Sequence, residues 1–228
     1  MAATSADASW ESFFSLLQRQ GFRPRQIVDV GANHGLWTRG ALQHFPTAEF
    51  LLIEPQGQLE AEVQDLVRQG FKLRWISAGV SDAPGRLPLT IAPQDCSSNF
   101  GMTPEAAAAH GYQQTTVEIR TLDEILATER LPVPDMLKID AEGFDLKVLA
   151  GASDCIGKTD IILIEAGVCA MGIENTMAAV MARMTELGYK LIDVTDLNRS
   201  PRHGVLWLCE LAFMRCGCPL LEKISSYQ

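Results

Sequence analysis

The chain has 228 residues, a length that one globular domain commonly reaches, and 47% of them are hydrophobic, which suffices for a sizeable core. Its formal net charge of −9 disfavours nucleic acid and anionic membranes as partners, because both present negative charge to the protein surface. No leader-like segment or bilayer-length apolar run is visible, and the six cysteines form no CxxC pair, so we predict a cytoplasmic protein with reduced thiols.

Apolar periodicity then predicts the elements in chain order. A helix within residues 9–20 forms an N-terminal segment, 1–22, that ends near Gly21. Buried strands are predicted at 27–30, 49–54, 72–80, 136–140 and 161–165, and helices at 36–44, 57–69, 143–149 and 175–187 alternate with them. Strand-like runs at 87–91 and 116–120 lie in a more irregular stretch, and TLDE at 121–124 has the form of a capping box that opens a helix.

Strands that alternate with helices predict a mostly parallel sheet with helices on both faces. The last two strands, 190–194 and 205–214, are separated only by the polar stretch 195–204, so they are expected to pair as an antiparallel hairpin. We interpret the irregular segment 93–114 as a lid over a substrate. The whole chain, 1–228, is predicted to form a single α/β domain.

A glycine-containing turn, DVGANHG at 29–35, follows the first strand. Gly31 and Gly35 allow the backbone to turn sharply and to approach a bound molecule closely. A dinucleotide fingerprint would require glycines where the chain has Asn33 and Leu36, so this turn is better suited to a single nucleoside with a charged tail.

Two further signals follow neighbouring strands. Glu54 ends the second strand about twenty residues past the turn, where a carboxylate can accept hydrogen bonds from ribose hydroxyls. Ser81 and Asp82 follow the third strand, where they could receive the amino group of an adenine. Taken in this order, the signals predict a nucleoside-type ligand.

These motifs, together with IEP at 53–55, AGVSD at 78–82, SSN at 97–99, LKIDAEG at 137–143 and ILIEAG at 162–167, resemble the FkbM family of methyltransferases over residues 20 to 215. The resemblance implies the Rossmann-like fold of class I methyltransferases, with seven strands and an antiparallel C-terminal hairpin. It also implies S-adenosylmethionine as cofactor and methylation of a hydroxyl on a small molecule, such as a sugar, a glycan or a polyketide-type natural product.

The resemblance assigns cofactor roles by position. The turn at 29–35 would contact the methionine part of the cofactor, Glu54 its ribose, and residues 80–82 its adenine. The full predicted cofactor-binding set is Asp29, Gly31, Ala32, Asn33, His34, Gly35, Glu54, Pro55, Val80, Ser81, Asp82, Ser98 and Asp140.

A hydroxyl is a poor nucleophile until a base removes its proton, so a catalytic base is expected beside the methyl group. The candidates are Asp140, Glu142, Glu165 and His203. Alternatively, Asp140 holds the cofactor's ammonium group, Glu142 caps the next helix, Glu165 bonds to a loop, and His203 is a surface residue. The three carboxylates could also assemble a magnesium site, although we expect no metal.

Two rival functions remain open at this stage. A nicotinamide-dependent oxidoreductase could use a similar fold, and a non-catalytic protein could bind S-adenosylmethionine without transferring its methyl group. The expected partner is a small hydroxylated acceptor, with no nucleic acid and no membrane. A homo-oligomer could form through the apolar N-terminal helix.

Overall fold

In the computed structural model, which describes residues 9–92 and 98–224, the main sheet has seven strands in the order β3-β2-β1-β7-β8-β10-β9. The strands are β1 (Gln26–Val30), β2 (Glu49–Ile53), β3 (Lys72–Ile76), β7 (Met136–Ile139), β8 (Ile161–Gly167), β9 (Tyr189–Arg199) and β10 (Leu206–Arg215). The first five are parallel, and β10 lies antiparallel between β8 and β9. This is the predicted Rossmann-like arrangement, and the predicted hairpin is confirmed.

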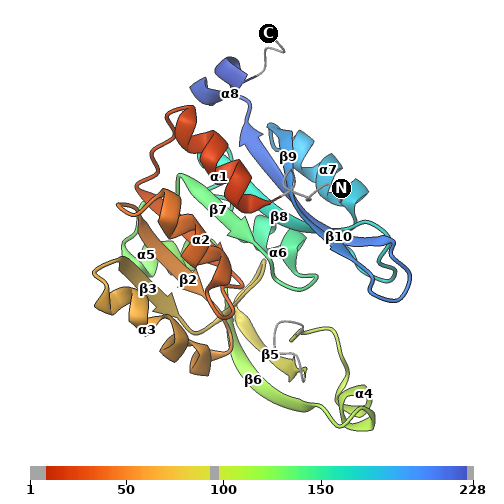
Figure 1. Ribbon diagram of the computed structural model, residues 1–228. Coiled ribbons are helices and arrows are strands. Elements are labelled where there is room, and N and C mark those ends of the chain that lie inside the picture. Colours follow the sequence, from red (N-terminus) through yellow and green to blue (C-terminus); the bar gives the residue numbers. More distant parts are fainter. Residues whose placement is uncertain (1–8, 93–97, 225–228) are drawn as a thin grey trace, which may run out of the picture.

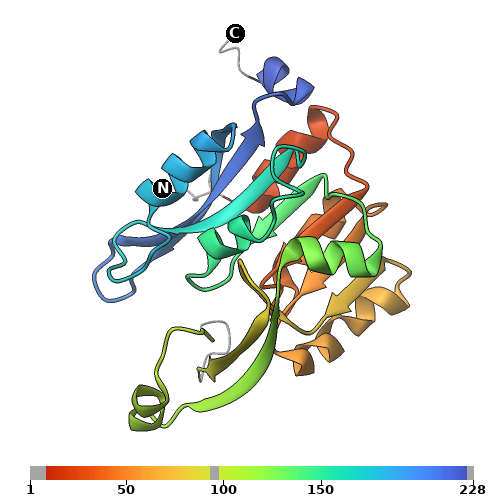
Figure 2. The same cartoon turned by 180° about the vertical axis from the view of Figure 1, so that it is seen from behind.

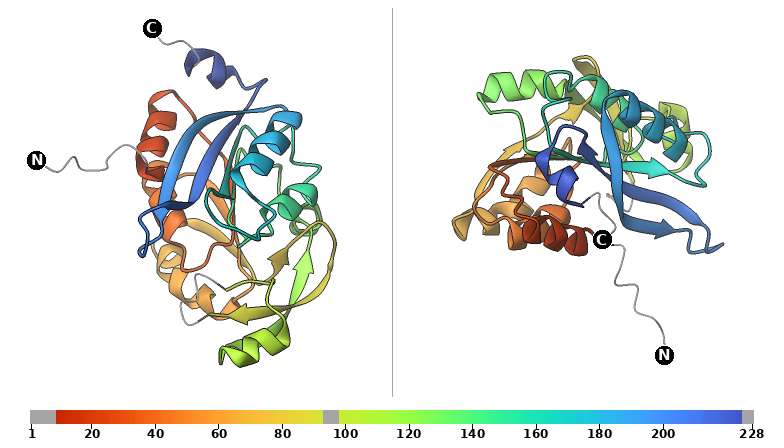
Figure 3. Two further views of the ribbon diagram at one scale, coloured as in Figure 1. Left: turned by 90° about the vertical axis from the view of Figure 1, so that its right-hand side faces the viewer. Right: turned by 90° about the horizontal axis from the view of Figure 1, so that it is seen from above.

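Helices cover both faces of this sheet (Figures 1 and 2). One face carries α1 (Trp10–Arg19), α2 (Leu36–His44) and α3 (Glu60–Arg68), the last preceded by the short helix η1 (Gly57–Leu59), and the other carries α5 (Leu122–Glu129), α6 (Asp145–Ala150) and α7 (Met177–Glu186). A final helix, α8 (Pro219–Ile224), follows β10. The view from above in Figure 3 shows helices on both sides of the strands.

Alternating strand residues divide the core into two layers. Val28 and Leu51 pack with the α5–α7 layer, whereas Ile27 and Leu52 pack with the α1–α3 layer, and all four are fully buried. Since successive strand side chains point to opposite faces, uninterrupted apolar strands are what a sheet covered on both sides requires.

A second sheet of three strands projects from the main one. It has the order β4-β6-β5, with β4 (Gly79–Val80), β5 (Gly85–Ile91) and β6 (Gln113–Arg120). The strand predicted at 72–80 was therefore wrong in its extent: β3 ends at Ile76, where the amide of Ala78 donates back to the carbonyl of Ile76 at 3.2 Å. This tight turn leads the chain away from the main sheet, and residues 79–80 pair with β6 instead.

The segment predicted as a lid, 93–114, lies only partly in the described ranges, since residues 93–97 fall outside them. Its helix, α4 (Pro104–Ala109), lies at the outer end of the β5–β6 pair (Figure 1). Ser98 and Phe100, by contrast, lie beside the cavity described below. The role of the segment as a lid stays a prediction.

The polar stretch 195–204 is less of a loop than predicted. The strand β9 continues to Arg199, and Leu206 of β10 pairs with it, so only residues 200–205 connect the two strands. Polar side chains fit here because the hairpin extends beyond the helices, with Asp196, Leu197 and Asn198 exposed. This extension carries the hairpin past the end of the main sheet (Figure 1).

Local signals at helix ends agree with the structure. The hydroxyls of Thr121 and Thr176 accept hydrogen bonds from the amides of Glu124 and Ala179 at the starts of α5 and α7.

Within the described ranges, the helices are too short or too polar for any to cross a bilayer. Cys155, Cys169, Cys209, Cys216 and Cys218 are free thiols. The cytoplasmic location stays a prediction.

Gly40 lies in the interior of α2 with the Trp10 ring directly against it. A β-carbon at Gly40 would lie 1.7 Å from Cζ3 of Trp10. An alanine normally stabilises a helix by about 1 kcal/mol relative to glycine, but here we expect Gly40→Ala to destabilise the protein by about 1–3 kcal/mol, because the ring must move. Urea unfolding measures the change.

The matched control for Gly40→Ala is the double variant that also carries Trp10→Ala. Removing the ring removes the clash, so Gly40→Ala should no longer destabilise the protein in that background. A stabilising effect of Gly40→Ala in the wild-type background would contradict the packing of Trp10 on α2.

Candidate active site

A cavity of about 440 Å³ opens at the carboxyl ends of β1, β2 and β7. This is the edge at which open α/β sheets bind ligands, and the volume falls in the range of small-molecule sites. Its wall includes the turn after β1, the end of β2, residues 78–80, the loop after β7, the starts of α1 and α2, and the β9–β10 hairpin. Residues from distant parts of the chain therefore meet in one hollow.

The turn after β1 passes very close to the loop after β7. Gly31 has φ +76°, and a β-carbon there would lie 1.7 Å from the carbonyl oxygen of Asp140. Asn33 also has a left-handed backbone, at φ +46°, and its side-chain oxygen accepts the amide of His34 at 2.8 Å. Glycine at position 31 thus serves the packing of two loops as well as access to the cavity.

Glu54 holds the turn against the end of β2. Its two carboxylate oxygens accept the amides of Asn33 and Gln56, each at 3.0 Å. The side chain lines the cavity although the residue is only 4% exposed, and burial raises the pKa of Glu54 against the lowering effect of these two amides. A carboxylate oxygen has two lone pairs, so Glu54 can still accept hydrogen bonds from a ligand.

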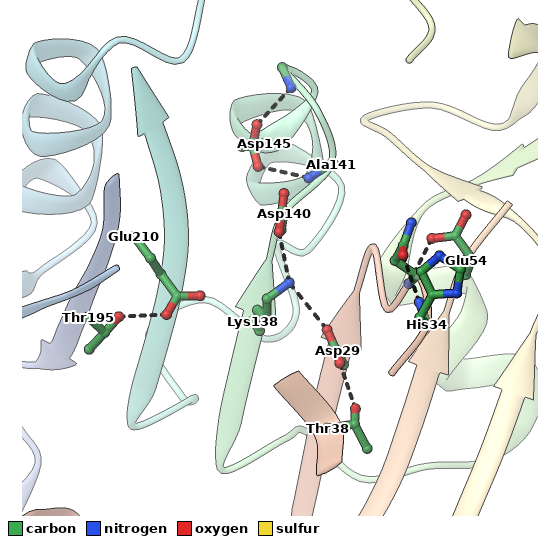
Figure 4. A network of polar contacts seen from close by, with 12 residues as sticks. Asp29, His34, Thr38, Glu54, Lys138, Asp140, Ala141, Asp145, Thr195 and Glu210 are labelled. Carbon is green, nitrogen blue, oxygen red and sulfur yellow. Dashed lines mark hydrogen bonds and ion pairs between the residues drawn. The ribbon is translucent and has the colours of Figure 1, made fainter. Parts of the chain in front are cut away.

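Lys138 is buried in the middle of the site. Its ammonium group lies 3.1 Å from Oδ2 of Asp140 and 3.5 Å from Oδ1 of Asp29, as Figure 4 shows. Burial alone would lower the pKa of Lys138, but Asp140, Asp29 and Glu210 together raise it above its ordinary value. The lysine is therefore the positive charge that pairs with Asp140 and Asp29 and that attracts Glu210.

Asp29 lies beneath the cavity and does not line it. The residue is fully buried and accepts the hydroxyl of Thr38 at 2.6 Å. Burial raises the pKa of Asp29 although Lys138 and Thr38 both oppose the shift. In the structure, Asp29 thus joins the first strand to α2 and to Lys138.

A buried clamp shapes the loop after β7. The carboxylate of Asp145 accepts the amides of Ala141 and Gly143 at 3.0 and 3.1 Å and the side-chain amide of Asn175 at 2.7 Å. Between these two amides, Glu142 adopts a left-handed backbone with φ +50°, which is uncommon for a residue with a side chain. The clamp therefore presents Asp140 and Glu142 to the cavity.

Carboxylates crowd the cavity wall and repel one another. Burial, followed by the charges of Asp140, Asp145 and Glu142, raises the pKa of Glu165 far above its ordinary value. Burial likewise raises the pKa of Glu210 to about 7, with Lys138 and Thr195 opposing the shift. Some of these groups therefore hold protons at neutral pH, which lets them donate hydrogen bonds as well as accept them.

The structure brings most of the predicted site residues together. The cavity wall contains Gly31, Ala32, Asn33, His34, Glu54, Pro55, Val80, Ser98, Asp140, Glu142 and Glu165. Gly35 is the residue just before α2 and does not line the wall. Ser81 is buried and donates a hydrogen bond to Asp82 at 2.9 Å, and neither of these two residues lines the wall. The assigned roles of all these residues stay predictions.

His203 lies apart from the other three candidates for the base. It is an exposed residue in the turn of the β9–β10 hairpin, and its amide donates to the hydroxyl of Ser200 at 3.3 Å. It does not line the cavity. Its role as a base stays a prediction, but Asp140, Glu142 and Glu165 are the candidates that share the hollow.

Sequence reasoning overlooked several residues that build the site: Trp10, Trp37, Lys138, Asp145, Asn175, Asp196 and Glu210. For Lys138 a signal existed, because a lysine within the apolar strand MLKI must find a buried counter-charge. Glu210 gave a similar signal within LWLCELAFMR.

Among the described residues, no group of three or more histidine, cysteine or acidic side chains could hold a metal ion.

The strand order, with an antiparallel strand inserted next to the edge, and the cavity at the carboxyl ends define a class I methyltransferase fold. The family model for the methyltransferase FkbM domain matches residues 29–191. The chain therefore belongs to the FkbM methyltransferase family, as its motifs predicted.

Three curated relatives are similar over part of the chain. They are the hexuronic acid methyltransferase AglP of Haloferax volcanii (30% identity, 36% of this chain), the 2-O-methyltransferase NoeI of Sinorhizobium fredii (24%, 61%) and the methyltransferase sdnD of Sordaria araneosa (27%, 56%). The matches span 38%, 62% and 60% of these proteins' own lengths, less than two thirds of each.

Solved structures share the fold at low sequence identity. The chain is similar to TrmK of M. capricolum in complex with S-adenosylhomocysteine, with a TM-score of 0.51 and 8% identity over 89% of this chain and 67% of that one. It is also similar to the N-methyltransferase NodS of Bradyrhizobium japonicum, with a TM-score of 0.50 and 7% identity over 90% and 93%. At such identities the likeness concerns the fold alone.

Proposed function

We propose that the protein transfers a methyl group from S-adenosylmethionine to a hydroxyl oxygen of a small molecule. The observation that carries this proposal is the cavity itself. A buried carboxylate, Glu54, lies at one end, and three carboxylates able to take a proton, Asp140, Glu142 and Glu165, lie further along the same wall. Membership of a methyltransferase family supports the reaction type.

S-adenosylmethionine is the methyl donor, as the resemblance to the FkbM family implied. The residues fit this cofactor because the missing β-carbon of Gly31 lets the turn after β1 pack against Asp140, so that both line the cavity, and because Glu54 retains lone pairs for ribose hydroxyls. When bound, the cofactor supplies an activated methyl group on a positively charged sulfur. Carboxylates along the wall suit both this charge and the ammonium group of its methionine part.

The protein's own task is to orient the acceptor and to remove its proton. The wall would hold the acceptor's hydroxyl oxygen next to the methyl group that the cofactor would supply, and a carboxylate of the wall would take the hydroxyl proton. Asp140 is our preferred base, because Lys138 fixes its position at 3.1 Å and the Asp145 clamp fixes its loop. The acceptor is a sugar, a glycan or a polyketide-type molecule; the name of AglP, a hexuronic acid methyltransferase, supports a sugar-type scaffold, and that of the 2-O-methyltransferase NoeI supports methylation of an oxygen.

Calorimetry with S-adenosylhomocysteine tests the cofactor site, and Glu54→Ala should weaken binding by about 10- to 100-fold through the lost hydrogen bonds. Glu49→Ala is the matched control, since Glu49 begins the strand that Glu54 follows but is exposed and pairs with Lys72 outside the cavity. Equal affinity of both variants would exclude Glu54 from the site.

Stabilisation by NAD but not by S-adenosylhomocysteine in thermal melts would favour an oxidoreductase.

Cofactor binding should depend on pH. Raised pKa values leave protons on carboxylates such as Glu165 at neutral pH, and an arriving cation favours their ionised forms. Binding therefore releases protons, and affinity should rise with pH by up to about tenfold per unit for each proton released. The same linkage applies to folding. Carboxyl groups whose pKa is raised in the folded protein stabilise the ligand-free fold at low pH, and this stabilisation is lost as the pH rises through their folded-state pKa values.

Calorimetry in phosphate and in Tris detects this release, because the two buffers take up protons with different heats. The observed enthalpy should differ between the buffers, and the difference should shrink in Glu165→Gln. Identical enthalpies in both buffers would show that the carboxylates are already ionised.

A further inference from the structure

The cavity extends beyond the part that suits a nucleoside. In Figure 4, Glu54 and Glu210 lie on opposite sides of Lys138. The end at Glu210 is enclosed by the starts of α1 and α2 and by the β9–β10 hairpin, which come from opposite ends of the chain. Its lining residues are Trp10, Leu36, Trp37, Asp196, Asn198, Leu208 and Glu210. This second end is the place for an acceptor, an inference that rests on the proposed function.

Aromatic side chains are built into this end. The Trp10 ring is partly exposed and lies against Gly40, where any β-carbon would displace it. Trp37 is only 7% exposed, and its indole N–H has no hydrogen-bond partner among the described residues. Because this N–H is itself buried, Trp37 contributes apolar surface to this end and not a donor for the ligand.

The charges at this end are almost all negative. Asp196 is exposed on the hairpin, and Glu210 is buried with its carboxylate accepting the hydroxyl of Thr195. Among the described residues that line the cavity, Lys138 is the one lysine, and there is no arginine. The ammonium group of Lys138 already lies beside Asp140 and Asp29. His34 is at the other end and pairs with Glu62.

We propose that the acceptor binds between the α1–α2 starts and the β9–β10 hairpin, and that it carries no negative charge next to the hydroxyl that is methylated. A neutral or cationic hydroxy compound can donate hydrogen bonds to Asp196, Glu210 and the Asn198 amide oxygen and can place an apolar face on Trp10. A carboxylate or phosphate there would lose its water beside two carboxylates without gaining a free counter-charge from the described residues of the wall.

Two matched trios of acceptors test the proposal. One trio is methyl glucoside, methyl glucosaminide and methyl glucuronide, and the other is 4-hydroxybenzyl alcohol, 4-hydroxybenzylamine and 4-hydroxybenzoate. Within each trio the scaffold stays the same while the charge is zero, positive or negative. We would measure binding to the protein saturated with S-adenosylhomocysteine, and methyl transfer from labelled S-adenosylmethionine.

The expected result is that a neutral or cationic member of at least one trio binds and that the anionic members do not. Asp196→Lys should improve the affinity of the anionic member of that trio by about fivefold or more, since it replaces repulsion with attraction at the entrance. Glu118→Lys is the control, because it makes the same change of charge on an exposed position of β6, outside the cavity wall. Asp196→Asn provides a milder change if the lysine variant does not fold.

Two outcomes would overturn the proposal: an anionic member that binds as well as its neutral partner, or no binding by any of the six compounds. Equal effects of Asp196→Lys and Glu118→Lys would also overturn it, because the hairpin would then not face the acceptor. The proposed function fails separately, if the wild-type protein does not bind S-adenosylhomocysteine at all.

Discussion

Replacing Lys138 with methionine is expected to lower the free energy of unfolding by about 3–5 kcal/mol, because it leaves a buried carboxylate without its counter-charge. The ammonium group of Lys138 lies within 3.5 Å of Asp29, which is fully buried and has Thr38 as its hydrogen-bond partner. Methionine fills a similar volume, so the cavity left behind is small and the loss reports on the charge. Urea unfolding at neutral pH measures the effect.

The surface pair of Lys72 with Glu49 supplies the control. The two side chains meet at 2.8 Å, yet both are largely exposed, so Lys72→Met should change stability little. Adding Asp29→Asn to Lys138→Met should recover part of the loss by removing the orphaned charge. A double variant no more stable than the single one would show that the penalty does not come from Asp29.

The sign of the pH dependence provides an independent check on Lys138→Met. Burial already raises the pKa of Asp29 in the native protein, and losing the lysine raises it further. A carboxyl whose folded-state pKa is raised stabilises the fold below that value and loses this effect as pH rises through it. The difference in free energy of unfolding between Lys138→Met and the wild type should therefore be smaller at pH 5 than at pH 8.

The sequence predicted the architecture well because a strand that is buried on both faces has a run of apolar residues, which is visible locally in the sequence. Strands such as IVDV and IILIE are mostly apolar and largely buried, and the alternation of strands with helices follows directly from chain order. The errors lie where pairing depends on distant partners. Residues 79–80 look like a continuation of β3, and only their pairing with β6 places them in another sheet.

The candidate site could be predicted on its nucleoside side, where Gly31 and Glu54 lie in short, ordered motifs. The other side could not, because its residues are separated by almost the whole chain. In the sequence, the position of Trp10 indicates only the apolar face of a helix, and the positions of Asp196 and Asn198 indicate only a polar loop. Only the extension of the β9–β10 hairpin beyond the sheet brings them to the same cavity.

Asp140→Asn is expected to reduce methyl transfer by about 100-fold or more while the protein remains folded. The amide oxygen of asparagine can still accept a hydrogen bond from Lys138, which now lies 3.1 Å from the carboxylate, so the loop after β7 should keep its shape. An amide, however, cannot take the acceptor's proton. Turnover of the acceptor found by labelled-methyl screening, together with the melting temperature, measures both parts of the expectation.

The binding constant of S-adenosylhomocysteine separates the two roles considered for Asp140. If the carboxylate is the base, turnover falls while the affinity for this product changes little; if it holds the cofactor's ammonium group, the affinity falls as well. Asp135→Asn is the matched control, since Asp135 lies just before the same strand at its opposite end and accepts the amides of Arg25 and Gln26. Wild-type turnover in Asp140→Asn would remove this residue from the catalytic group and leave Glu142 and Glu165, the other two candidate bases in the shared wall, to take the proton.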